Sequence, residues 1–163
     1  MYKRCLILLP VLLLAACGFH LRGSQSAPAV SISSVYLQSQ GAEGVAAEIR
    51  KQLKQTDTTL AANAGEADYV LNLSDQRTRS TVLSVSATTG KVNKYKMFLS
   101  VLVSISRGET PLVTRETVQV TRDYAFDPGA VLAKTAEERL LQEDMVRSAA
   151  SQIILRLNAL SRD

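Results

Sequence analysis

The sequence has few of the side chains on which most enzyme chemistry depends. It contains one histidine, His20, and two cysteines, Cys5 and Cys17. There is no second histidine for a zinc site, no Gly-rich phosphate loop and no serine in a Gly-x-Ser-x-Gly frame. We therefore expect no catalytic residue, no metal and no cofactor, and only an enzyme built from Asp and Glu stays open. The acidic pairs available to such an enzyme occur in a helical pattern typical of a solvated face: Glu137/Glu138 and Glu143/Asp144.

The N-terminal hydrophobic run is also short. It extends from Leu6 to Leu14, well under the roughly 20 apolar residues that a membrane-spanning helix needs. Lys3 and Arg4 precede it and small residues follow it, which is typical of a secretory signal. The segment Leu14-Ala15-Ala16-Cys17-Gly18 further resembles the bacterial lipobox. This predicts removal of residues 1–16 and lipidation of Cys17 as the first mature residue; the alternative is an ordinary signal with a chance cysteine.

The lipobox resemblance implies a location. Bacterial lipoproteins carry several acyl chains on this cysteine, and because a single chain binds a membrane only reversibly, several chains predict permanent anchoring. Gly18 stands where an Asp typically retains such proteins at the inner membrane. We therefore expect a lipid anchor at the periplasmic face of the outer membrane.

After removal of residues 1–16, the composition predicts a small domain whose stability depends on the packing of its core. The formal net charge of +4 falls to +2 when Lys3 and Arg4 leave with the signal, too weak a balance to indicate nucleic acid as a partner. Since Cys5 leaves as well, the mature chain has no internal disulfide. Residues 17–31 lack periodicity and predict a lipidated tether, of which residues 18–31 span at most about 46 Å. Residues 32–163 are long enough for a single domain with a core.

Hydrophobic periodicity predicts the elements of this domain. We expect a strand over 32–38, then a helix in which Val45, Ile49 and Leu53 share one face. A loop at 61–65 leads to an alternating strand from Tyr69 towards Leu83. A turn at 87–91, a strand over 95–105, a hairpin connection at 107–110 and a returning strand over 112–124 follow.

The last element is predicted to be a long amphipathic helix. Asp127 suits its N-cap and Pro128 its first position. An apolar stripe then follows at steps of three or four residues: Leu141, Met145, Ala149, Ile153, Leu157 and Leu160.

This order predicts an α+β fold with two layers. A helical crossover favours parallel pairing after the first strand, whereas the short connections require antiparallel neighbours. We expect a four-stranded, mostly antiparallel sheet with both helices packed on one face, in the order β-α-β-β-β-α. The other face, with Ser100, Ser104, Gln119 and Thr121, would be polar.

The mature chain would begin Cys17-Gly18-Phe19-His20-Leu21-Arg22-Gly23, and it later contains Tyr95-Lys96-Met97 and Asp123-Tyr124-Ala125-Phe126-Asp127-Pro128-Gly129-Ala130-Val131-Leu132-Ala133-Lys134. These segments resemble LptE, the lipopolysaccharide-assembly lipoprotein family, and the likeness covers nearly the whole mature chain. It implies an outer-membrane lipoprotein that plugs the LptD β-barrel, supports its folding and binds lipopolysaccharide during insertion into the outer leaflet.

The resemblance also implies ligand-binding positions. Lys134 matches a family lysine implicated in lipopolysaccharide binding, although it could equally be a solvated lysine. A second basic position of the family is matched here by Thr88, and Lys91 could supply the charge from three residues away. Four further cations could form a patch with it or be scattered, depending on strand register: Arg77, Arg79, Lys94 and Lys96.

Partner contacts are expected in the tether, where Phe19 and Leu21 could face the barrel wall or lipid. The runner-up function is a non-catalytic auxiliary lipoprotein that scaffolds another envelope transporter without touching lipid cargo. It shares the anchor, the tether and the fold, so only binding of lipopolysaccharide separates the two.

Overall fold

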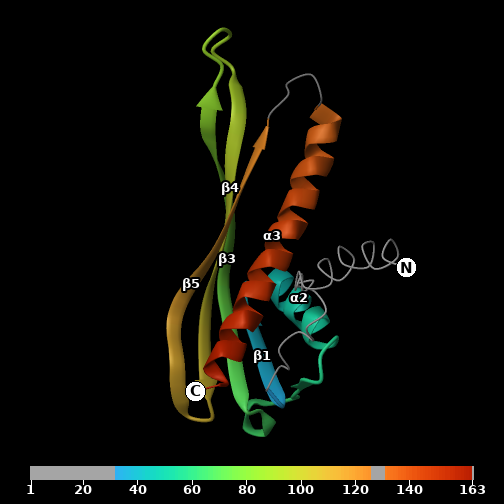
Figure 1. The fold of residues 1–163 in the computed structure, drawn as a ribbon, viewed down its shortest axis with the longest axis vertical. Helices are drawn as coiled ribbons and strands as arrows, with labels where there is room; N and C mark the ends of the chain where they lie inside the picture. Colours follow the sequence, from blue (N-terminus) through green and yellow to red (C-terminus); the bar gives the residue numbers. More distant parts are fainter. Residues whose placement is uncertain (1–31, 126–130, 163) are drawn as a thin grey trace, which may run out of the picture.

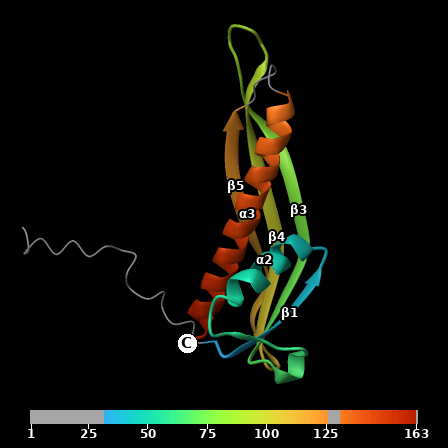
Figure 2. The same cartoon turned by 90° about the vertical axis from the view of Figure 1, so that its right-hand side faces the viewer.

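A single five-stranded sheet with two helices on one side forms the domain (Figure 1 and Figure 2). The computed structural model describes residues 32–125 and 131–162, with side chains of the second range from residue 136 onward. The strands are β1 (Ser34–Gln40), β2 (Thr59–Leu60), β3 (Tyr69–Val85), β4 (Val92–Arg107) and β5 (Thr110–Ala125). The helices are α2 (Glu43–Leu53), α3 (Val131–Leu160) and the short 3-10 helix η1 (Ala64–Glu66). The predicted two-layer α+β architecture is confirmed.

The sheet has the order β2-β1-β3-β4-β5, and its pairing follows the length of each connection. β1 runs parallel to β3, with Val35 opposite Tyr69, because α2 carries the chain back between them. β3, β4 and β5 are antiparallel neighbours joined by short turns.

Three parts of the prediction need comment. The sheet has five strands rather than four, because β2 adds beside β1: the Thr59 amide donates to the Ser33 carbonyl at 2.9 Å and the Ala61 amide to the Val35 carbonyl at 3.0 Å. A two-residue strand has no alternation to detect. The predicted loop at 61–65 is partly helical, in η1. The proposed cap residues of the last helix, Asp127 and Pro128, lie outside the described residues.

The core lies between the helices and one face of the sheet. β4 contributes one continuous row of buried side chains at every second position, and the predicted stripe of α3 packs against the same core. Both rows are nearly inaccessible: Met97, Leu99, Val101, Val103 and Ile105 from the sheet, and Met145, Ala149, Ile153 and Leu157 from the helix.

A β-bulge interrupts β3 after Ser74. Ser74 pairs with Leu102 and Arg77 with Ser100, so β3 has one more residue than β4 across this step. Asp75 occupies the left-handed region with φ 57°, and the Gln76 amide donates to the Gly41 carbonyl at 3.0 Å. The side-chain oxygen of Gln76 accepts a hydrogen bond from the Val45 amide at 3.1 Å, near the start of α2.

The bulge should contribute measurably to stability through Gln76. We expect Gln76→Ala to lower the free energy of unfolding by about 1–2 kcal/mol, because the partly buried Val45 amide loses its acceptor. Urea unfolding measures the effect. Gln119→Ala, a matched change at an exposed sheet position, should stay within about 0.5 kcal/mol of the parent. Equal losses for the two variants would contradict this role.

Candidate functional site

The sheet register brings four predicted cations onto one face. Arg77 lies opposite Ser100 and Arg79 opposite Phe98, while Lys96 and Lys94 lie opposite Thr81 and Ser84. Opposed residues of an antiparallel pair point to the same side. The core-facing row of β4 occupies the other side, so all four cations lie on the face turned away from the helices, here named the outer face.

Only part of this charge is neutralised. Arg77 Nε lies 2.7 Å from Asp75 Oδ1, and Lys96 Nζ lies 3.9 Å from Asp123 Oδ1. The Arg79 guanidinium lies 5.1 Å from the centre of the Phe98 ring. Within the described part of the chain, Arg79, Lys91 and Lys94 form no ion pair.

Exposed ion pairs of this kind are weak, so the row keeps its positive potential. We name the five residues Arg77, Arg79, Lys94, Lys96 and Lys91 the cationic stripe.

A shallow hollow lies at one end of the cationic stripe. It measures about 250 Å³ and is lined by both arginines, by Asp75, which pairs with Arg77, and by residues of β4 and β5: Ser100, Val101, Leu102, Thr117 and Gln119. The hollow therefore combines guanidinium groups with hydroxyl and amide groups that can bind an anionic or sugar-like ligand.

Lys91 lies at the opposite end of the cationic stripe, in the turn between β3 and β4. The Ser86 amide donates to the Lys91 carbonyl at 2.8 Å, and the Lys91 amide donates to Thr89 Oγ1 at 3.4 Å. These bonds hold the Lys91 backbone, while its side chain and Thr88 are exposed.

The remaining predicted site residues, Lys134, Cys17, Phe19 and Leu21, are not found on the described part of the outer face. Lys134 lies in the first turn of α3, whose start is directed towards the hairpin end of the molecule in both views (Figure 1 and Figure 2). α3 packs on the inner face, so the Lys134 backbone belongs to the opposite layer from the cationic stripe. Its side chain lies outside the described part, as do Cys17, Phe19 and Leu21.

A tyrosine cluster joins the end of β5 to α3. The Tyr124 hydroxyl donates to Glu138 Oε1 at 2.9 Å, and its ring stacks on Tyr95 with centres 5.5 Å apart. Burial raises the pKa of Tyr124, and the hydrogen bond to Glu138 raises it further. Tyr124 thus fixes the position of β5 against the helix shortly before the segment that leads to Lys134.

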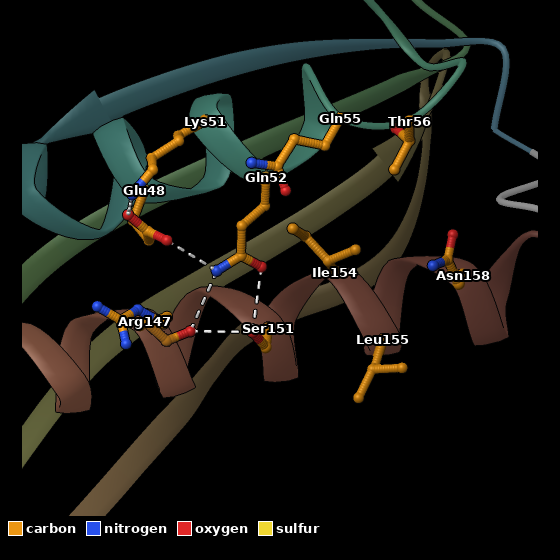
Figure 3. A pocket seen from close by; sticks show the side chains of 10 residues that line it. All are labelled: Glu48, Lys51, Gln52, Gln55, Thr56, Arg147, Ser151, Ile154, Leu155 and Asn158. Atoms are coloured by element: carbon orange, nitrogen blue, oxygen red, sulfur yellow. Dashed lines mark hydrogen bonds and ion pairs between the residues drawn. The ribbon is translucent and has the colours of Figure 1, made fainter. Parts of the chain in front are cut away.

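A second hollow, between α2 and α3, is a helix-packing junction (Figure 3). It measures about 670 Å³, and the Gln52 side chain lies in its middle. The Gln52 amide donates to Glu48 Oε1 at 3.1 Å, and its oxygen accepts from Ser151 Oγ at 3.1 Å. Most polar groups here bind one another, which favours a role in joining the two helices.

Sequence reasoning missed the residues that surround the cations. Asp75, Phe98 and Asp123 contact Arg77, Arg79 and Lys96 respectively. One signal was available: Tyr69, Leu71 and Leu73 alternate, and Asp75 breaks the apolar series where a further buried residue would follow. Such a break is compatible with a bulge, but it also fits the end of a strand.

Two further features are absent from the described residues, a membrane-spanning helix and a metal-binding cluster. No helix among them combines the length and apolar character needed to span a bilayer. They also contain no group of three or more histidine, cysteine, aspartate or glutamate side chains placed to hold a metal ion.

Comparison with solved structures identifies the fold. The chain shares its fold with small bacterial lipoproteins. One is the rare lipoprotein B from Shewanella oneidensis, at TM-score 0.69 and 24% identity, covering 80% of this chain and 96% of that one. Another is lipoprotein B from Nitrosomonas europaea, at TM-score 0.70 and 24% identity, covering 89% and 93%. At this identity the likeness concerns the fold alone.

Sequence comparison makes the assignment specific. The family model LptE, described as lipopolysaccharide-assembly, matches residues 29–157, and the chain belongs to this family. The LPS-assembly lipoprotein LptE of Pectobacterium atrosepticum is 34% identical over 155 residues, covering 91% of this chain and 80% of the relative. That of Photorhabdus laumondii is 30% identical over 151 residues, covering 91% and 81%.

The raised pKa of Tyr124 predicts a pH-dependent contribution to stability. At neutral pH, Tyr124→Phe should lower the free energy of unfolding by about 1 kcal/mol through loss of the hydrogen bond to Glu138. An unfolded tyrosine ionises near its ordinary pKa of 10.0, and the folded one ionises at higher pH.

The stabilisation by Tyr124 is therefore complete below about pH 10 and is lost as pH rises through the raised pKa. Denaturant unfolding of both proteins from pH 7 to 11 should show the difference narrowing above pH 10. A constant difference would contradict the assignment.

Proposed function

We propose that the chain is the outer-membrane lipoprotein subunit of the lipopolysaccharide translocon. Residues 1–16 act as the signal, Cys17 carries the lipid anchor at the periplasmic face, and residues 17–31 form the tether to a domain over residues 32–163. The subunit plugs and helps to assemble an LptD-like β-barrel, and it binds lipopolysaccharide during insertion into the outer leaflet. It does so without catalysis. The cationic stripe, in a member of the LptE family, is the observation that carries this proposal.

The charge of the ligand supports the use of the cationic stripe. Lipopolysaccharide bears phosphates and sugar carboxylates, which bind lysine and arginine side chains. A hydrogen bond to a charged group contributes about 1.5–3 kcal/mol, so several cations in a row can hold such a molecule where one would only orient it. We propose Arg77, Arg79, Lys91, Lys94 and Lys96 as ligand contacts, with Lys134 as a sixth.

The polarity of the outer face supports the plug. The lumen of a membrane β-barrel is polar, so a protein inside it needs hydrated surfaces rather than an apolar one. The outer face carries hydroxyl and amide side chains on neighbouring strands, with Ser100 opposite Gln119 and Asn72 opposite Ser104, and Phe98 and Leu102 are apolar residues among them. Phe19 and Leu21 of the tether would supply apolar contacts to the barrel wall or to lipid.

The auxiliary-scaffold alternative remains distinguishable by one property. It predicts the same anchor and the same stable association with an envelope transporter, but no affinity for lipopolysaccharide. No observation favours it over cargo binding, because a scaffold has no need for the three cations that lack an ion pair among the described residues, Arg79, Lys91 and Lys94.

Removing charge from the cationic stripe should weaken ligand binding without unfolding the protein. We expect Lys91→Ala/Lys94→Ala to reduce affinity for purified lipopolysaccharide at least tenfold, measured by titration of the mature chain carrying Cys17→Ser. Lys134→Ala and Lys134→Asp should also weaken binding and leave thermal unfolding nearly unchanged.

The matched control is Lys51→Ala/Lys54→Ala, which removes the same charge from exposed positions at the end of α2. If this control weakens binding as much as the variants of the cationic stripe, net charge rather than position determines affinity. A loss of thermal stability equal to the loss of binding would assign Lys134 a structural role.

The partner claim has a direct test. The acylated full-length chain, purified with a C-terminal tag from detergent-solubilised outer membranes of its own bacterium, should bring down one large β-barrel at physiological salt. Mass spectrometry identifies the barrel. Absence of any stable barrel contradicts the plug, whereas a barrel combined with no lipopolysaccharide affinity supports the scaffold alternative.

A further inference from the structure

The tip of the β3–β4 hairpin exposes a cluster of aliphatic side chains. Val82, Leu83 and Val85 are 49%, 42% and 56% exposed, and they supply three of the five large apolar side chains exposed in the described part of the chain. The other two, Leu140 and Leu155, lie 15 residues apart on α3. Single exposed apolar residues are ordinary, but three within four residues indicate a contact surface.

Val85 and Val92 lie beyond the three-stranded part of the sheet, whereas Val82 and Leu83 lie at its end. The last pair between β4 and β5 joins Lys94 to Ala125, so the hairpin beyond it is a two-stranded ribbon. Figure 1 and Figure 2 show this ribbon projecting past the helical layer. Val85 lies opposite Val92 there, and a ribbon of two strands gains little stability from such a pair.

Cations directly adjoin this aliphatic cluster. Lys91 precedes Val92 in the turn, and Lys94 lies opposite Ser84 on the outer face, whereas the neighbouring pair Val85 and Val92 points to the other side of the ribbon. Lysine side chains can lay their apolar stems along such a surface and extend the ammonium group beyond it. The tip therefore combines aliphatic side chains with cations on one narrow ribbon, which complements a ligand whose anionic head adjoins acyl chains.

We propose that the aliphatic tip, Val82, Leu83, Val85 and Val92, contacts the acyl chains of lipopolysaccharide, while Lys91 and Lys94 contact its phosphates. This inference rests on the proposed function and adds to it the part of the ligand that each group meets. The cationic stripe then leads from the lipid end of the ligand at the tip to sugar groups at the hollow beside Arg77 and Arg79. Because Lys91 and Lys94 are cationic and the phosphates of this glycolipid are anionic, the tip favours this ligand over an uncharged apolar partner.

Binding measurements with and without the acyl chains test the proposal. In the mature chain carrying Cys17→Ser, Leu83→Ser/Val85→Ser should reduce affinity for intact lipopolysaccharide roughly tenfold to a hundredfold. Affinity for deacylated lipopolysaccharide, which keeps its phosphates and sugars, should not change. Leu140→Ser/Leu155→Ser is the control, at somewhat more exposed positions, and should bind both forms like the parent.

A fluorescent probe gives an independent readout. Because the chain has no tryptophan, Val85→Trp introduces a single emitter at the tip. Its emission should shift to the blue with intact lipopolysaccharide, and not with the deacylated form. Vesicles of anionic phosphatidylglycerol and of zwitterionic phosphatidylcholine should produce a smaller shift than lipopolysaccharide at equal lipid concentration.

Each outcome has one meaning. If the tip variants bind intact lipopolysaccharide like the parent, or lose intact and deacylated ligand equally, the acyl-chain contact is wrong while the proposed function stands. An equal or larger shift with phosphatidylglycerol overturns the commitment to lipopolysaccharide. If the parent chain binds neither form, both the inference and the cargo-binding part of the proposed function fail.

Discussion

The β-bulge at Asp75 and Gln76 determines which side chains of β3 face the helices and which face away. Along an uninterrupted strand, Arg77 and Arg79 would share the side of Leu73, towards the core. The extra residue reverses this alternation, so both arginines reach the outer face, where the Arg79 guanidinium lies over the Phe98 ring. The same interruption turns Gln76 towards α2, where it accepts the Val45 amide. One irregularity therefore holds the start of a helix and places two of the five residues of the cationic stripe on the outer face.

The two faces of the sheet have separate roles as a consequence. The inner face is filled by apolar side chains that are almost inaccessible to water, and it supplies the packing on which stability depends in a fold without an internal disulfide. The outer face has few internal contacts beyond weak ion pairs. Substitutions there change a surface rather than a core.

Periodicity predicted most of the fold because the signals were local and strong. The alternation of β4 and the stripe of α3 each repeat over many residues, and the buried positions found match them, as at Leu99 and Met145. β2 escaped prediction because two residues contain no period. The common face of Arg79 and Lys96 escaped it because register depends on a bulge whose only trace in the sequence is Asp75. The position of Lys134 relative to the other cations could not be predicted, because it depends on how α3 packs on the sheet, and the spacing of residues in the sequence does not reveal that packing.

The parallel pairing of β1 with β3 gives the molecule two distinct poles. Because Val35 lies opposite Tyr69, the chain enters the domain at the end farthest from the hairpin turn. The 17 residues of β3 rise about 55 Å between these poles. The proposed tether, residues 18–31, would reach at most about 46 Å. The proposed anchor at Cys17 would thus limit how far the domain travels from the leaflet without dictating which pole points towards it, and the proposed barrel would have to determine that orientation.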